Sequence, residues 1–450
     1  MRQSFDLSKY NVSYDIGFVL MSPLKTLPSY FNPWNELAES LPKLMREKKV
    51  REAVRRLPLL DHSQLVGHRQ LRLAHLQLSF ITAGYVWQDG DKGVPQVLPK
   101  CVAFPFYNIS KELGIQPILG HVDLALANYH LINPSGNLQC LYHIPGGLAG
   151  DWFCVVTFML EFSFARCLKH LVRILDLLEV AHVQMRADEK GCKDTERKDN
   201  EREMAECLDD ITLAVQNMEA SLARMHDNLD AKMFFNVIRP FLGGWGGEGN
   251  ALPDGLIYEG ISDYPIKMPG GSAAQSTTLQ ILDALLGVEH TEDKRAFLVH
   301  MRSFMPPDHC RLIVDLEQKR PHKLRDLGNL ILANDDLAIQ ELYEAYNNCV
   351  SALVHLRNYH IQIVTKYVIQ ASQTVNKGNY ESLDKKGTGG TSLIPFLKDI
   401  RSDTQKKIMP IPHAQSKKSQ GKLMSWQKVA VVVAITASMA VGAIKLLKYK

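Results

Sequence analysis

The sequence predicts a mainly α-helical protein. Long stretches space their apolar side chains three and four residues apart, which is the period of one face of an α-helix. The clearest of these stretches cover residues 62–86, 152–183 and 334–373. The chain has 450 residues, enough for a large hydrophobic core and for two or three domains.

The N-terminal third combines helices with loop-like sequence. Residues 33–57 begin with a proline at the first helical turn and carry amphipathic spacing, and residues 118–130 have the composition of a short helix. Residues 87–108 contain Gly and Pro and predict a loop with a brief extended run around Val102. Gly, Pro, Asn and Ser then gather at residues 133–151, the best candidate for a domain boundary. We therefore expect a small N-terminal domain over residues 1–137.

Residues 138–404 are expected to form a larger, helical domain. Its first helix, 152–183, repeats the three-and-four spacing from Phe153 and Thr157 onward. Residues 187–203 mix both charge signs and predict a solvated loop or a helix extension. Further helices are expected at 204–229, 275–287, 293–304 and 393–404, and loops at 243–249, 253–271 and 374–392.

Composition and charge narrow the class of protein. Charged residues make up 22% of the chain and the formal net charge is only +4, so we expect no nucleic-acid partner. None of the eight cysteines forms a CxxC pair or has zinc-site spacing, and no N-terminal signal peptide is visible. These features favour reduced thiols and a cytoplasmic location.

The C-terminus differs from the rest of the chain. Val429 to Ile444 is free of charged residues and is flanked on both sides by lysines. Extending it through Leu447 brings it near the roughly 20 residues of a membrane-spanning helix. We therefore expect a polar linker at 405–428 and a tail anchor at 429–447, holding a cytosol-facing protein on the endoplasmic reticulum or the mitochondrial outer membrane. A buried terminal helix is the alternative.

One histidine lies on the apolar stripe of the helix predicted at 334–373. His360 follows Leu356 and precedes Ile363 at helical spacing, which is a core position. A buried imidazole needs a partner for its ring nitrogens. Neighbouring carbonyls are one such partner and a metal is another, because haem iron takes a proximal histidine in this way.

Three other segments are candidates for a ligand site. Arg239 lies in the apolar run 234–245, and an arginine in such surroundings needs an anion, either a structural or a ligand carboxylate. Small residues at 270–276 precede a helix and either allow close ligand approach or form a turn capped by serine. The segment 387–391 (GTGGT) lacks the lysine of a phosphate-binding loop and predicts either a closing loop or a linker.

Several of these segments resemble the indoleamine 2,3-dioxygenase family over about residues 10–405. The matching segments are 254–260 (DGLIYEG), 270–276 (GGSAAQS), 298–307 (LVHMRSFMPP), 356–367 (LRNYHIQIVTKY) and 387–398 (GTGGTSLIPFLK). The resemblance implies a small mixed α/β N-terminal domain and a large all-helical haem domain with one haem b. It also implies an oxidoreductase of the kynurenine pathway that converts L-tryptophan or another indoleamine and O₂ to N-formylkynurenine. An electron donor would keep the haem ferrous, and the chain would be a monomer.

The resemblance also implies roles for individual residues. His360 falls on the proximal iron ligand, with Asp283 as the carboxylate that orients it directly or through water. Phe153, Thr157 and Arg239 match residues of the reacting pocket, and Arg239 would bind the substrate carboxylate. The remaining substrate-binding positions are His121, Ser272, Ala273 and Thr388.

This chain departs from the family pattern at three positions of the pocket. Thr157 stands where many members have serine, His121 where they have tyrosine, and Ala274 where they have glycine. His121 is alternatively an ordinary surface histidine. These changes leave open a haem oxygen carrier, like the myoglobins of some molluscs that resemble this family, or a weakly active signalling homologue. Arg239 and Thr388 favour the enzyme, because a carrier needs no carboxylate clamp.

Overall fold

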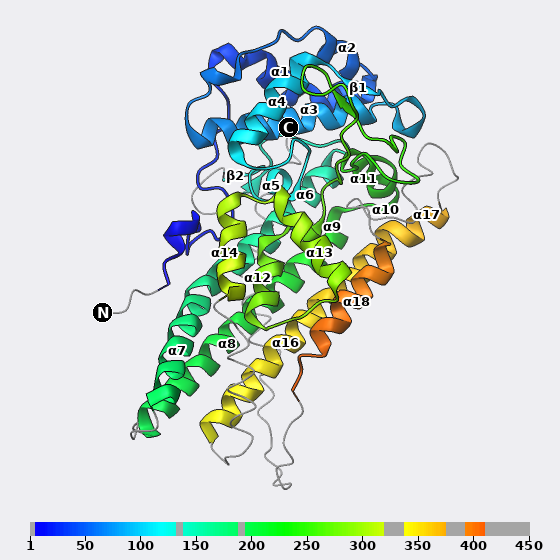
Figure 1. Cartoon of the computed structure of the whole chain (residues 1–450). Helices are drawn as coiled ribbons and strands as arrows, with labels where there is room; N and C mark the ends of the chain where they lie inside the picture. The colour runs from blue at the N-terminus through cyan, green and yellow to red at the C-terminus, as the bar shows by residue number, and fades with distance from the viewer. Residues whose placement is uncertain (1–4, 132–137, 188–193, 319–336, 375–391, 410–450) are drawn as a thin grey trace, which may run out of the picture.

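A computed structural model describes residues 5–131, 138–187, 194–318, 337–374 and 392–409, and it is mainly α-helical as expected (Figure 1). The strands in the described part have two residues each and form two pairs. Strand β1 (Val97–Leu98) runs parallel to β4 (Ile257–Tyr258), and β2 (His130–Leu131) runs antiparallel to β3 (Leu138–Gln139). The remaining regular structure in the described part is helical. The helices described next are those that position the residues of the site.

The N-terminal region is built around one almost wholly buried helix. This helix is α3 (Gly67–Trp87), in which every residue from Leu71 to Trp87 is buried. It packs between α1 (Asn32–Glu47) and α4 (Lys100–Leu113), with α2 (Val50–Arg55) beside it. The short helix α5 (His121–Leu124) then leads toward the second region.

Helix α4 corrects the loop predicted at residues 87–108. Pro105 lies inside this helix, and proline disfavours a helix because it lacks a backbone N–H. Val102, Phe106 and Ile109 nevertheless lie on one face and are fully buried. Burying three large apolar side chains stabilises the helix by several kcal/mol, at roughly 1.5–3 kcal/mol each, which outweighs one proline.

The second region is a set of long helices that run side by side in the lower part of Figure 1. Helix α8 (Asp194–Ala223) packs along α16 (Leu337–Val364), while α6 (Leu148–Phe164) and α7 (Leu168–Ala187) pack against α8. Helix α18 (Leu393–Gln405) covers α16 on another side. Three shorter helices, α12 (Thr277–Leu285), α13 (Glu292–Met301) and α14 (Pro307–Gln318), complete this region.

Two predicted long helices are interrupted. The stretch 152–183 divides into α6 and α7 at a 3₁₀ turn, Ala165–Cys167. The stretch 334–373 continues beyond α16 as a π-helix, Thr365–Gln370, and then as α17 (Ala371–Thr374). Of the charged segment 187–203, the part from Asp194 is helix, so the expectation of a helix extension is confirmed there.

The proposed domain limits and the tail remain predictions. Residues 132–137, at the expected boundary, and 410–450, which include the expected anchor, lie outside the described residues. Within the described part, the apolar helical stretch Leu148–Ala181 is long enough to cross a membrane, but half of its most apolar window is buried against other helices. This stretch therefore belongs to the core.

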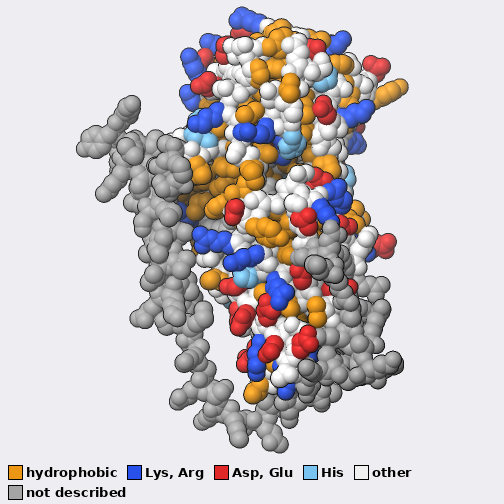
Figure 2. Space-filling model, turned by 90° about the vertical axis from the view of Figure 1, so that its left-hand side faces the viewer, with side chains coloured by type: hydrophobic (Ala, Val, Ile, Leu, Met, Phe, Trp, Pro, Cys, Tyr) orange, Lys and Arg blue, Asp and Glu red, His pale blue; other side chains and the backbone are white. Residues whose placement is uncertain are grey.

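The face in Figure 2 mixes acidic and basic side chains over its lower half.

Candidate functional site

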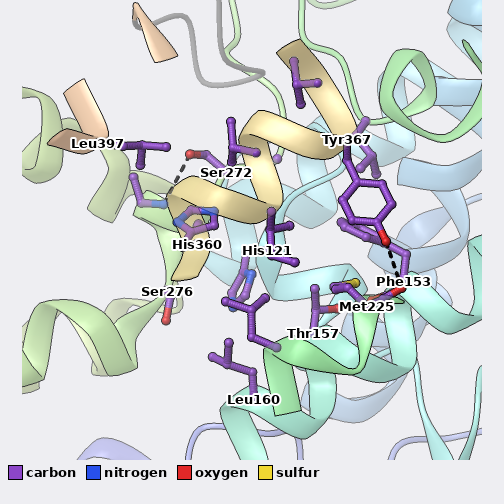
Figure 3. Close-up of a pocket in the computed structure, with 18 of the residues that line it drawn as sticks. His121, Phe153, Thr157, Leu160, Met225, Ser272, Ser276, His360, Tyr367 and Leu397 are labelled. Carbon is purple, nitrogen blue, oxygen red and sulfur yellow. Dashed lines mark hydrogen bonds between the residues drawn. The ribbon is translucent and has the colours of Figure 1, made fainter. Parts of the chain in front are cut away.

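A cavity of about 270 Å³ lies between α6, α16 and α18. Seven of the nine predicted site residues line it, and they come from segments far apart in the sequence: His121, Phe153, Thr157, Arg239, Ser272, Ala273 and His360. Asp283 lies outside this lining, and Thr388 lies outside the described residues. Figure 3 shows His360 on α16, with Phe153 and Thr157 on α6.

His360 is shielded from bulk solvent but open to the cavity. Burial lowers the pKa of His360 to about 4, and the positive charge of Arg357 lowers it further in the same direction. The imidazole is therefore neutral near pH 7. Neither ring nitrogen forms a hydrogen bond with the described part of the chain, so the carbonyl partners of a purely structural histidine are not found there. A neutral imidazole with an open nitrogen is the form that ligates a metal.

Asp283 supports the His360 helix through an arginine. Its carboxylate accepts hydrogen bonds of 2.7 and 2.8 Å from Nη2 of Arg357, which is three residues before His360 on α16. Burial alone would raise the pKa of Asp283, but Arg357 and His290 hold it below its ordinary value. Within the described residues Asp283 makes no hydrogen bond to His360 and instead binds Arg357 on the same helix, so the predicted orientation of His360 by this carboxylate stays a prediction.

The same arginine connects α16 to α18. Arg357 also donates to Oγ1 of Thr404, and Asp403 lies 3.2 Å from both His290 and Lys294. Helix α18 supplies Leu393, Phe396 and Leu397 to the cavity wall. These polar contacts, which sequence reasoning missed, hold the apolar face of α18 over the cavity.

Helix α6 supplies an aromatic ring and a hydroxyl group. The ring of Phe153 lies 5.4 Å from that of Phe234 at a tilted angle. Oγ1 of Thr157 lies 3.1 Å from the carbonyl oxygen of Phe153 and 2.8 Å from that of Cys154, so the hydroxyl directs its hydrogen to its own helix. It remains able to accept a hydrogen bond from the cavity.

His121 joins a buried carboxylate on the cavity wall. Its Nε2 lies 2.9 Å from Oε1 of Glu161, which also accepts hydrogen bonds of 2.6 Å from Ser276 and, at Oε2, from Thr278. The alternative of an ordinary surface histidine is wrong, because only 13% of this side chain is exposed. Sequence reasoning missed Glu161, although a single carboxylate inside the apolar run 157–164 is a usable signal.

Arg239 enters the cavity from a distorted helix. It follows a π-helix, Phe234–Ile238, opens the short helix α11 (Arg239–Phe241) and is only 3% exposed. Its guanidinium lies 5.7 Å from the ring centroid of Phe235. Such π-helical turns are frequent at functional sites.

The small residues at 270–276 have two roles. Ser272 caps a 3₁₀ turn, Ala273–Gln275, with its hydroxyl accepting from the N–H of Ala274 at 3.2 Å, so the capped turn predicted here is confirmed. Gly270 allows two backbones to meet, because a Cβ there would lie 2.3 Å from the carbonyl oxygen of Leu242. This close approach places Ser272 and Ala273 at the cavity.

Comparison with known proteins identifies the family. The family model described as indoleamine 2,3-dioxygenase matches residues 6–407. A myoglobin of Haliotis madaka is 44% identical over 400 residues, covering 89% of this chain and 98% of its own. Indoleamine 2,3-dioxygenase 2 of Mus musculus is 38% identical over 413 residues, covering 90% and 95%. Indoleamine 2,3-dioxygenase 1 of Rattus norvegicus is 36% identical over 419 residues, covering 90% and 96%. The chain therefore belongs to the indoleamine 2,3-dioxygenase family.

Proposed function

We propose that this chain binds haem b through His360 and opens the indole ring of L-tryptophan with O₂ to give N-formylkynurenine. The observation that carries the proposal is the neutral imidazole of His360, open to a cavity that Arg239 and Phe153 also line. Family membership supports the same assignment. Bound haem would supply the iron that activates O₂, and an external electron donor would keep that iron ferrous.

The residues of the chain fit this cofactor and substrate. His360 would hold the iron because its nitrogens have no other partner in the described structure and its pKa keeps it unprotonated. Arg239 offers a planar guanidinium that matches a carboxylate, and Phe153 offers an apolar surface for the indole. Leu393, Phe396 and Leu397 on α18 add apolar surface to the cavity wall.

An oxygen carrier of the same fold is the second candidate. Two relatives at 44% identity are called myoglobin, from Haliotis madaka and Haliotis diversicolor. A carrier would need His360 and the apolar cavity but would not need a guanidinium beside it. Because Arg239 is buried at the cavity, we favour the enzyme.

Turnover by the full chain separates the two candidates. The protein would be purified in detergent, loaded with haem, reduced and mixed with L-tryptophan and O₂, and the absorbance of N-formylkynurenine would be followed. We expect product to form. A stable oxygen complex without product would refute the dioxygenase and support the carrier.

A variant of the ligand tests the haem site separately from catalysis. His360→Ala should lose haem during gel filtration, whereas His355→Ala, five residues earlier on the same helix and exposed, should retain it. If His360→Ala kept haem with an unchanged absorption spectrum, the ligand assignment would be wrong.

We also propose that residues 429–447 anchor the protein in an intracellular membrane with the body facing the cytosol. The support is the charge-free run from Val429 to Ile444 and its flanking lysines. A fluorescent protein fused to residues 405–450 should label the endoplasmic reticulum or mitochondria. Diffuse fluorescence would refute the anchor.

A further inference from the structure

His121 and Glu161 form a polar pair on the wall of an otherwise apolar cavity. Glu161 is fully buried, and its two oxygens accept from three donors: His121, Ser276 and Thr278. Burial alone would raise the pKa of Glu161, but the hydrogen bonds from these three donors, His121 first, lower it below its ordinary value. The group is therefore a carboxylate, which can only accept hydrogen bonds.

The carboxylate fixes the tautomer of the neutral imidazole. With Oε1 of Glu161 at 2.9 Å, Nε2 of His121 must carry the hydrogen, because two facing acceptors would repel each other. Nδ1 then has a lone pair and no hydrogen.

Nδ1 is open to the cavity. It forms no hydrogen bond within the described residues, and it is not among their buried polar atoms that lack a partner. His121 lines the cavity, and Figure 3 shows it near Thr157 and below His360. The cavity therefore offers a hydrogen-bond acceptor whose direction is set from behind by Glu161.

We propose that Nδ1 of His121 accepts a hydrogen bond from the ring N–H of the bound aromatic substrate, so that His121 selects heteroaromatic rings that carry an N–H donor. This inference rests on the proposed function and names a substrate feature that the site recognises. The competing acceptor is Oγ1 of Thr157, which also faces the cavity. His121 is the better acceptor, because the lone pair of an imidazole nitrogen is a stronger acceptor than that of a hydroxyl group and Glu161 fixes its direction.

The test compares two ligands that differ in the donor. L-tryptophan and its benzothiophene analogue, in which sulfur replaces the ring N–H, would be titrated into the haem-loaded full chain by isothermal calorimetry. The titration would be run at pH 8 and without reductant, which prevents turnover. We expect tryptophan to bind about three- to tenfold more tightly, the effect of one net hydrogen bond.

Variants assign this preference to a residue. His121→Phe should bring the ratio of the two dissociation constants to about one, and so should the double variant H121F/E161Q, which avoids an unpaired buried carboxylate. His143→Phe is the matched control, because His143 forms a similar pair with Asp151 at 2.8 Å but lies outside the cavity lining. It should keep the wild-type ratio.

The possible results separate this inference from the proposed function. Equal binding of both ligands to the wild type would overturn this inference alone, since tryptophan would still bind. If the ratio of the two dissociation constants persisted in both His121 variants but fell to one in Thr157→Val, the acceptor would be Thr157, and the inference about His121 would be overturned as well. Failure of both ligands to bind would overturn the proposed function together with this inference.

Discussion

Replacing Asp283 by asparagine should destabilise the protein strongly, although the two side chains have nearly the same shape. Asp283 and Arg357 form a hydrogen-bonded ion pair whose side chains are only 12% and 10% exposed. Asparagine would leave the guanidinium of Arg357 buried without a counter-charge. Breaking such a buried pair costs about 3–5 kcal/mol.

This free energy converts to a shift in melting temperature. At about 2.1 cal/mol/K per residue, the unfolding entropy of a chain of this size is roughly 0.9 kcal/mol/K. Asp283→Asn should therefore lower Tm by about 3–5 °C. Thermal unfolding followed by circular dichroism at 222 nm would measure it.

A surface carboxylate in the same region provides the control. Asp399 on α18 pairs with Lys294 at 3.6 Å, but its side chain is 58% exposed. Asp399→Asn should change stability by less than about 1 kcal/mol. If both variants shifted Tm equally, or if D283N/R357Q were as destabilised as the sum of its single variants, the pair would not be the buried interaction described above.

Three further predictions concern other residues. Burial lowers the pKa of His309 to about 3, helped by the positive charge of Arg72. Below about pH 6.5 this residue binds a proton in the unfolded state but not in the folded state. Acidification from pH 7 to 5 should therefore lower the free energy of unfolding by about 2 kcal/mol. In urea unfolding, the free energy of unfolding of His309→Gln should fall by about 2 kcal/mol less than that of the wild type between pH 7 and 5. An equal fall in both proteins would contradict the lowered pKa of His309. Gly270→Ala should destabilise by about 2 kcal/mol, because its Cβ would meet a carbonyl oxygen at 2.3 Å, whereas Gly271→Ala, at 3.6 Å, should be nearly neutral in the same urea assay. Arg239→Gln should reduce the calorimetric preference for L-tryptophan over tryptamine, which lacks the carboxylate, by roughly 10- to 100-fold; an unchanged preference would exclude Arg239 as the carboxylate clamp.

Helical periodicity predicted the long helices α3, α6 and α16, because burial repeats with the helical period. It failed at α4, where Pro105 suggested a loop while Val102, Phe106 and Ile109 were already spaced for burial. It also could not show where a helix changes its hydrogen bonding, as α16 does at Thr365. Such a change depends on contacts with other helices and leaves the local spacing almost unaltered.

The site was predicted in part. The family resemblance named seven residues that the fold brings to one cavity, of which His121 is the first in the sequence and His360 the last. It did not show that Asp283 contacts Arg357, or that Glu161 lies behind His121. The paired residues are 40 or more positions apart in the sequence. Local patterns in a single sequence do not show which distant residues come into contact.

The π-helix before Arg239 has a consequence for the register of the chain. Such a turn holds one residue more than an α-helical turn, and each residue of an α-helix advances the direction of the side chain by about 100°. Deleting a single residue between Phe234 and Ile238 would restore regular α-helix, and the side chains after it would keep nearly the same direction, because the π-turn already accommodates the extra residue. The guanidinium of Arg239 would then stay at the cavity, although its position in the sequence would shift by one. Relatives that lack this residue would therefore present the same arginine to the ligand from a regular α-helix, so the length of this turn can vary without loss of the site.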